Sequence, residues 1–208
     1  GVAYGSASAP ETPGSGGIGY SGGVLGGHGG GAVRIQATGT VTINGSVLAT
    51  GQNGYERGDI HASAGSGGSI YISCRRLEGS PTGLVQANGG NTGWNGWGGS
   101  GGRVAVLYNV AAQAGYNPGV RFQVAGGVHG TRRQDASDGT LYLPDFNMFS
   151  ETMGGSQFGR ARALIAGRTN WSVASLTLTN CDLTFGTDRF SLTVTNNLTI
   201  GSNARLGF

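Results

Sequence analysis

A repeated pair of phrases constrains the fold of this chain more than any other feature of its sequence. Four segments join a glycine-rich or polar run to a short apolar stretch: GGGAVRIQA from Gly29, GSGGSIYIS from Gly65, GSGGRVAVLY from Gly99 and SDGTLYLP from Ser137. The first apolar residues of these stretches are about 37, 34 and 37 residues apart. A second phrase recurs between them as GSVLATGQNG, GLVQANGGN and GVRFQVAGG. The chain is therefore built from repeated units of two or three short strands and a glycine-rich loop.

Within each stretch, apolar residues alternate with residues expected to face outward, as in half-buried strands. The expected inward pairs are Val33 with Ile35, Ile70 with Ile72, and Val104 with Val106, whereas Arg34, Tyr71 and Ala105 are expected outward. No window has a 3.6-residue apolar period, so helix is expected to be nearly absent. A single unit cannot bury its apolar face, so the units should stack about 4.8 Å apart, with glycine at corners and close approaches. These features predict an all-β fold, a right-handed parallel β-helix or β-solenoid.

The sequence predicts three regions along the chain. Residues 1–143 are expected to form glycine-rich β-helix repeats, and residues 144–170 an irregular excursion that packs on the coil. Residues 171–208 are richer in threonine and asparagine and should continue the β-helix with shorter units. The last residues continue the strand pattern, so we expect either more polypeptide beyond them or a strand edge that docks onto a partner. The start, Gly1-Val2-Ala3, suggests a processed product or an excised piece. A homo-oligomer or filament joined through solenoid ends is one form of this prediction.

Composition excludes several classes of function. The chain has 44 glycines in 208 residues, only 11% charged residues, and 13 basic residues that are all arginine. Without lysine there is no phosphate-binding P-loop and no Schiff-base chemistry. The arginines are scattered rather than clustered, which argues against nucleic-acid binding, and no apolar run reaches 18 residues, which argues against membrane insertion. Histidines are too far apart in sequence for a recognised metal site, and no cofactor motif is present.

Two charged loops and an aromatic loop hold the candidate functional residues. Glu56, Asp59 and His61 share one loop, Asp138 lies in a second charged loop two repeats later, and the tryptophans lie in a loop between the two. The predicted glycan-binding residues are Trp94, Trp97, His129, Arg132, Arg133 and Asp135. Aromatic faces beside arginine and carboxylate groups suit a sugar ring. The preferred interpretation of the tryptophans is a lid over apolar surface, and that of the charges is local pairing in solvated loops.

Cys74 and Cys181 are about three repeats apart, at least ~14 Å along the predicted coil, too far for a disulfide. We expect two separate thiols that are buried or half-buried.

The phrases GSGGSIYIS, GLVQANGG and GSGGRVAVLY resemble the glycine-rich parallel β-helix repeats of very large bacterial secreted and cell-surface, adhesin-like proteins. The resemblance covers about residues 1–143; DGTLYLPDF departs from it by losing the glycine run. It implies an extracellular or cell-surface location, a structural or adhesive role and no catalytic residue. The expected function is a non-enzymatic structural segment of an adhesin or a self-assembling fibre. The alternatives are a glycan-binding adhesin tip, or a polysaccharide lyase or hydrolase that uses Asp135 and Asp138.

Overall fold

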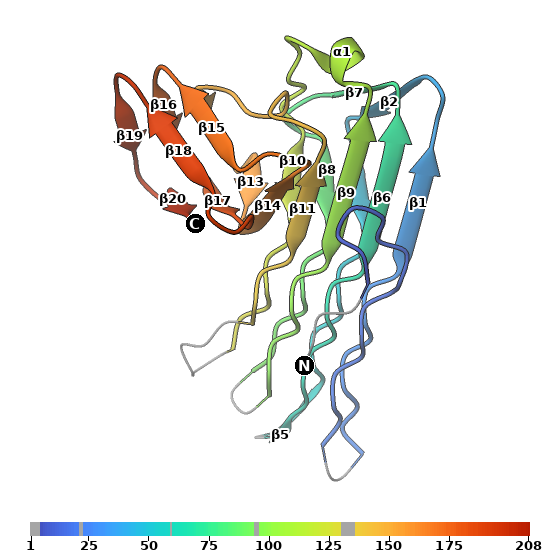
Figure 1. The fold of residues 1–208 in the computed structure, drawn as a ribbon. Helices are drawn as coiled ribbons and strands as arrows, with labels where there is room; N and C mark the ends of the chain where they lie inside the picture. Colours follow the sequence, from blue (N-terminus) through green and yellow to red (C-terminus); the bar gives the residue numbers. More distant parts are fainter. Residues whose placement is uncertain (1–4, 21–22, 59, 94–95, 130–135) are drawn as a thin grey trace.

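In a computed structural model, the chain is all-β with mostly parallel sheets (Figure 1). The structure describes residues 5–20, 23–58, 60–93, 96–129 and 136–208. Its one helix among these residues, α1 (Val110–Gln113), is a single turn with Asn109 as N-cap. None of the described helical residues forms a helix long and apolar enough to cross a membrane.

The largest sheet has seven strands, all parallel to their neighbours. In spatial order these are β1 (Ala32–Gln36), β6 (Ser69–Cys74), β9 (Arg103–Tyr108), β11 (Thr140–Leu143), β14 (Ala161–Ile165), β17 (Asp182–Phe185) and β20 (Arg205–Gly207). Spatial order equals sequence order, so the chain returns to this sheet one strand further along after every circuit. The sequence separation between paired residues shortens towards the C-terminus. Val104 pairs with Leu141, but Leu141 pairs with Ala163, which is much nearer to it in sequence.

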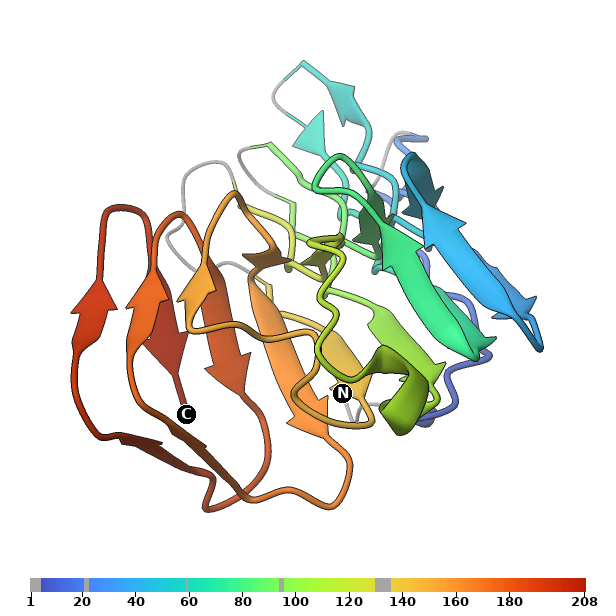
Figure 2. The same ribbon diagram turned by 90° about the horizontal axis from the view of Figure 1, so that it is seen from above.

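Smaller parallel sheets form the other sides of the circuits. One contains β3 (Ser46–Leu48), β8 (Leu84–Gln86), β10 (Arg121–Gln123) and β13 (Phe158–Gly159); another contains β12 (Thr152–Met153), β16 (Leu176–Leu178) and β19 (Leu198–Ile200). β2 (Thr40–Ile43) pairs with β7 (Arg76–Gly79), and β15 (Asn170–Val173) with β18 (Ser191–Val194). The pair β4 (Glu56–Arg57) and β5 (Ile60–His61) is antiparallel. Seen from above, successive circuits lie side by side from the blue N-terminal end to the red C-terminal end (Figure 2).

The core lies between these sheets, and most of the predicted inward residues are in it. Ile70, Ile72, Val104 and Val106 are completely buried, whereas Val33 and Ile35 are half-buried because β1 is an edge strand. Towards the C-terminal end of the core, aromatic side chains pack on one another. Phe146 stacks on Trp171 with ring centroids 5.3 Å apart, and Phe185 stacks on Phe190 at 4.2 Å.

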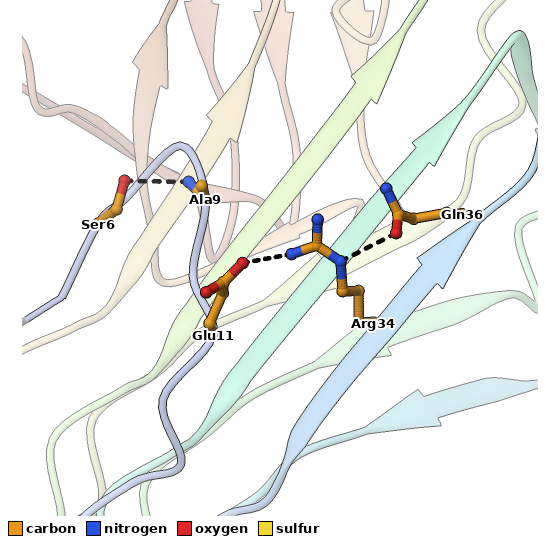
Figure 3. Close-up of polar contacts among 5 residues, drawn as sticks. All are labelled: Ser6, Ala9, Glu11, Arg34 and Gln36. Carbon is orange, nitrogen blue, oxygen red and sulfur yellow. Dashed lines mark hydrogen bonds and ion pairs between the residues drawn. The ribbon is translucent and has the colours of Figure 1, made fainter.

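Ala105 departs from the expected alternation, because it is fully buried rather than exposed. It lies in register between Tyr71 and Tyr142 on the adjacent strands, so larger side chains flank it on the same sheet face. The N-terminal segment, residues 5–12, crosses that face (Figures 1 and 3). Thr12 anchors the segment: its carbonyl accepts a hydrogen bond from Ser69 Oγ (2.6 Å), and its hydroxyl accepts one from Arg103 (2.8 Å).

Residues 144–170 also differ from the expected irregular excursion. They contain β12, β13 and β14, and β14 pairs in register with both β11 and β17 inside the seven-stranded sheet. The apolar residues of this segment lack a clear period because the strands are short and separated by turns. Positive φ angles at Gly155, Ser156 and Arg160 mark these turns. The segment thus contributes a strand to the seven-stranded sheet.

The two cysteines agree with the expectation: Cys74 and Cys181 are both free and buried.

Candidate functional site

Glycine-rich segments extend from the seven-stranded sheet as a bundle of extended chains (Figure 1). We call residues 49–54, 87–92 and 124–128 the outgoing legs, because they lead away from the sheets. Residues 24–31, 62–68, 97–102 and 136–139 are the returning legs, which lead back to β1, β6, β9 and β11. Residues 14–18 form a further leg, the first leg, in front of β1 in the sequence. Of the predicted site residues, Trp97 and His129 lie near the far ends of these legs.

Hydrogen bonds within the bundle follow a three-residue period. Ala64, Gly65 and Ser66 donate to three different legs, through the carbonyls of Trp97, Gln52 and Ser15, each at 2.9 Å. Gly67 and Gly68 then repeat the first two directions, towards Ser100 and Ala49. Three directions in three residues are typical of a polyproline II-type helix, which has three residues per turn and no internal hydrogen bonds. The leg 62–68 is therefore bonded sideways to three other legs.

Close approach explains most of the glycines of the described legs. None of them has a positive φ angle. Instead, a Cβ atom on Gly65 would lie 2.0 Å from the carbonyl oxygen of His28, and one on Gly90 would lie 2.1 Å from that of Gln52. Side chains at these positions would force the legs apart.

Asparagine side chains connect the outgoing legs of successive circuits. The Oδ1 atom of Asn53 accepts a hydrogen bond from the backbone N–H of Asn91, and Asn91 Oδ1 accepts one from Val128, both at 2.8 Å. Asn88 makes the same contact with Ala125 at 2.8 Å. These contacts add a side-chain ladder to the backbone bonds between the same legs.

Of the predicted site residues, the structure brings Trp97 and His129 together. Their ring centroids are 6.0 Å apart in an edge-to-face arrangement. His129 is buried and pairs with Thr92, whereas Trp97 remains 58% exposed. The exposure of Trp97 differs from the preferred expectation of a lid, because its indole leaves much of its surface open to solvent. Trp94, Arg132, Arg133 and Asp135 lie outside the described residues.

The described carboxylates near these loops make local contacts. Glu56 Oε1 lies 3.3 Å from His61 Nδ1 within the hairpin. Asp138 Oδ1 lies 2.9 Å from Arg160 and also accepts a hydrogen bond from the N–H of Gly126 at 2.9 Å. Asp59 lies outside the described residues. Over the part of the chain that the structure describes, no group of three or more histidine, cysteine or acidic residues could hold a metal ion.

Sequence reasoning missed a shallow groove on one face of the bundle, with a volume of about 270 Å³. The first leg forms one side of it, through Ser15 and Ile18, and the returning leg of Trp97 and Ser100 forms the other. Ser63, Ala64 and Ser66 form the floor. The available sequence signal was Gly14 and Gly17, a three-residue glycine spacing that the returning legs share. The lining residues are all uncharged, so the groove suits a neutral ligand.

Comparison with known proteins finds no matching family model, no matching curated protein and no matching solved structure.

Proposed function

We propose that this chain is a non-enzymatic parallel β-helix that serves as a structural segment of an extracellular or cell-surface adhesin or fibre. The observation that carries the proposal is the order of the seven-stranded sheet, in which strand follows strand in both sequence and space. Stacked circuits of this kind give a stiff rod whose stability comes from backbone ladders and a small-residue core. The resemblance to bacterial adhesin repeats points the same way.

The leg bundle supports a mechanical role. Backbone bonds link each returning leg to neighbouring legs, so these long loops are ordered by main-chain contacts and need few apolar or charged side chains. Extended segments with paired backbones are poor protease substrates, because cleavage requires local opening. A surface segment of this composition would keep its shape outside the cell without lysine and with few charges.

The two ends of the rod favour assembly. β1 and β20 are the outer strands of the seven-stranded sheet, and each leaves one edge unpaired within the described chain. Beside β20, an apolar groove of about 350 Å³ is lined by Leu192, Val194, Asn196, Leu198, Leu206 and Phe208. Leu198 is 50% exposed and Phe208 68%. An open strand edge with apolar side chains favours pairing with another solenoid end, and head-to-tail contacts of this kind generate filaments.

Electron microscopy across a concentration series tests this form of the proposal. Filaments should lengthen with concentration and have an axial repeat near the length of one rod. Leu198→Arg, which places a charge in the end groove, should shorten them. Thr199→Arg is the matched control, because Thr199 lies on the same strand but does not line the groove. Isolated rods at every concentration would contradict end-to-end assembly and leave a module of a larger adhesin.

Glycan binding is the second candidate, favoured by exposed aromatic side chains near the far ends of the legs. Tyr20, Tyr55 and Trp97 are 58%, 45% and 58% exposed. Exposed aromatic faces with polar rims suit sugar rings. The double variant Trp94→Ala/Trp97→Ala should lose binding on a glycan array while retaining its circular dichroism spectrum; unchanged binding would exclude this site.

A polysaccharide lyase or hydrolase is the less favoured alternative. The carboxylate of Asp138, one of its two candidate catalytic groups, already contacts Arg160 and the Gly126 N–H. If turnover of a polysaccharide were found, replacing Asp135 and Asp138 by asparagine should abolish it; unchanged turnover would exclude these carboxylates.

A further inference from the structure

The first leg occupies a defined position in the bundle, between the returning legs 24–31 and 62–68. Gly14 and Gly17 donate to the carbonyls of Gly30 and Gly27, both at 2.8 Å. In return, the carbonyls of Ser15 and Ile18 accept from Ser66 at 2.9 Å and Ser63 at 3.0 Å. The first leg is thus held by two donors and two acceptors, each pair spaced three residues apart.

The groove is the next equivalent position, between the returning legs 62–68 and 97–102. Because Ser69 pairs with Arg103, Ser100 is the register equivalent of Ser66, whose N–H bonds to the first leg. The Ser100 N–H donates to no atom of the described residues. The carbonyls of Ala64 and Gly67 are the register equivalents of the carbonyls of Gly27 and Gly30. They accept no hydrogen bond from any atom of the described residues. Trp97 is the equivalent of Ser63, and its N–H makes only a long contact of 3.4 Å to the Ser63 hydroxyl within the described residues.

The groove therefore presents equivalents of the donors and acceptors that hold the first leg. None of the described legs occupies it. Its neutral lining excludes a strongly charged partner. The first leg also shows which side chains fit, since a Cβ atom on Gly14 or Gly17 would lie 2.3 Å from Ser66 O or 2.1 Å from Ser63 O. An occupant with the same hydrogen bonds needs glycine at the two equivalent positions, three residues apart, which would face the carbonyls of Ser100 and Trp97.

We propose that this groove binds a glycine-rich segment of a separate polypeptide, in a polyproline II-type conformation and with glycine at every third position. The segment would add a leg to the bundle, as an added strand extends a sheet edge. Backbone hydrogen bonds would supply the affinity, and the close approach at the glycines would supply the specificity. The assignment is independent of the proposed fibre role, because it concerns the leg bundle and not the ends of the rod.

A peptide titration of the full chain tests the proposal. The probe is a synthetic peptide with the sequence of Thr12–Ile18, TPGSGGI, and the matched peptide carries valine at both positions equivalent to Gly14 and Gly17. Since each main-chain hydrogen bond contributes little net free energy in water, we expect a dissociation constant on the order of 1 mM. Binding should shift the amide NMR signals of Ala64, Trp97 and Ser100. The valine peptide should bind at least about tenfold more weakly.

Ser100→Pro is the discriminating protein variant. Proline fixes φ near the polyproline II value, removes an N–H that the described chain does not use, and places its ring in the groove. This variant should keep the thermal stability of the wild type but lose at least about tenfold in peptide affinity. Ser100→Ala retains the N–H and should bind as the wild type does. If Ser100→Pro does not fold, Ser100→Val, which adds bulk beside the groove, takes its place.

Three results would overturn the proposal. One is the absence of any peptide-dependent shift at millimolar concentration. Another is equal binding of the glycine and valine peptides, or equal binding by the wild type and Ser100→Pro. The third is self-association of the chain in the absence of peptide, if Ser100→Pro abolishes that self-association. A second copy would then fill the groove in place of a separate partner.

Discussion

Gly99 lies so close to Gly65 on the neighbouring returning leg that a Cβ atom on Gly99 would come within 1.8 Å of the Gly65 carbonyl oxygen. In turn, a Cβ atom on Gly65 would lie 2.0 Å from the carbonyl oxygen of His28 in the leg before. The spacing between legs is therefore set by backbone touching backbone. These contacts make the glycines part of the packing of the bundle.

Replacing Gly99 by alanine should destabilise the chain by about 2–3 kcal/mol, because the methyl group cannot fit without moving the leg of Gly65. Chemical denaturation would measure the loss. Gly31→Ala is the matched control: Gly31 is the last residue of the returning leg 24–31, its φ is not positive, and a Cβ atom there meets nothing within 4 Å. It should be neutral or more stable by about 0.4–1 kcal/mol. Equal stabilities of the two variants would refute this account of the glycines.

Gln113 takes the place of a strand at the edge of β7. It is fully buried; its side-chain oxygen accepts from Leu77 N at 2.9 Å, and its side-chain nitrogen donates to Leu77 O at 3.0 Å and Tyr116 O at 2.9 Å. Gln113→Leu leaves these three backbone groups unpaired, so we expect a loss of about 2–4 kcal/mol in the free energy of unfolding. Gln36→Leu, at an exposed glutamine on β1, should change it by less than about 0.5 kcal/mol. A stable Gln113→Leu protein would show that water replaces the amide.

Burial raises the pKa of Cys181 to about 11, and the nearby Asp182 carboxylate adds to the rise. The thiol of the unfolded chain ionises near pH 8.5. Unfolding therefore releases a proton between these two values, and the free energy of unfolding should fall by about 1.4 kcal/mol per pH unit as pH rises from about 9 to 11. Below pH 8 this contribution is complete. Denaturation curves between pH 8 and 10, for the wild type and Cys181→Ala, test this; a slope unchanged in the variant would contradict it. Burial also raises the pKa of Cys74, so part of the slope should remain.

The N-terminal segment should open independently of the sheets. Glu11 pairs with Arg34, which also donates to Gln36 at 3.0 Å, and Ser6 Oγ accepts from Ala9 N at 3.0 Å (Figure 3). The side chains of Glu11 and Arg34 are 65% and 46% exposed, so the pair contributes only about 0.2–1 kcal/mol and weakens with salt. Glu11→Gln should leave global unfolding nearly unchanged but speed proteolysis within residues 5–12. An equal cleavage rate in the two proteins, at low salt, would show that Thr12 alone holds the segment.

Several features could be predicted from the sequence because they depend on local patterns. The two-residue alternation around Ile70 and Val104 identified strands, and the repeat spacing identified which strands pair: Val33 with Ile70 and Ile70 with Val104. The short segments between 144 and 170 could not be predicted, since two-residue strands such as β12 and β13 are too short to show a period. The burial of Ala105 could not be predicted either, because it depends on Tyr71, Tyr142 and the N-terminal segment, all distant in sequence.

By itself, the sequence determined that this chain folds into parallel strands in repeated units, because alternation and repeat length act through short-range geometry and stacking. Only the tertiary structure decided what the glycines do and where the open surfaces lie. The leg 62–68 has neighbours in three directions, and the partners of Gly65 come from segments on either side of it in the chain. The groove between Ala64 and Ser100 is visible only when the surrounding legs are in place, since three segments distant in sequence line it.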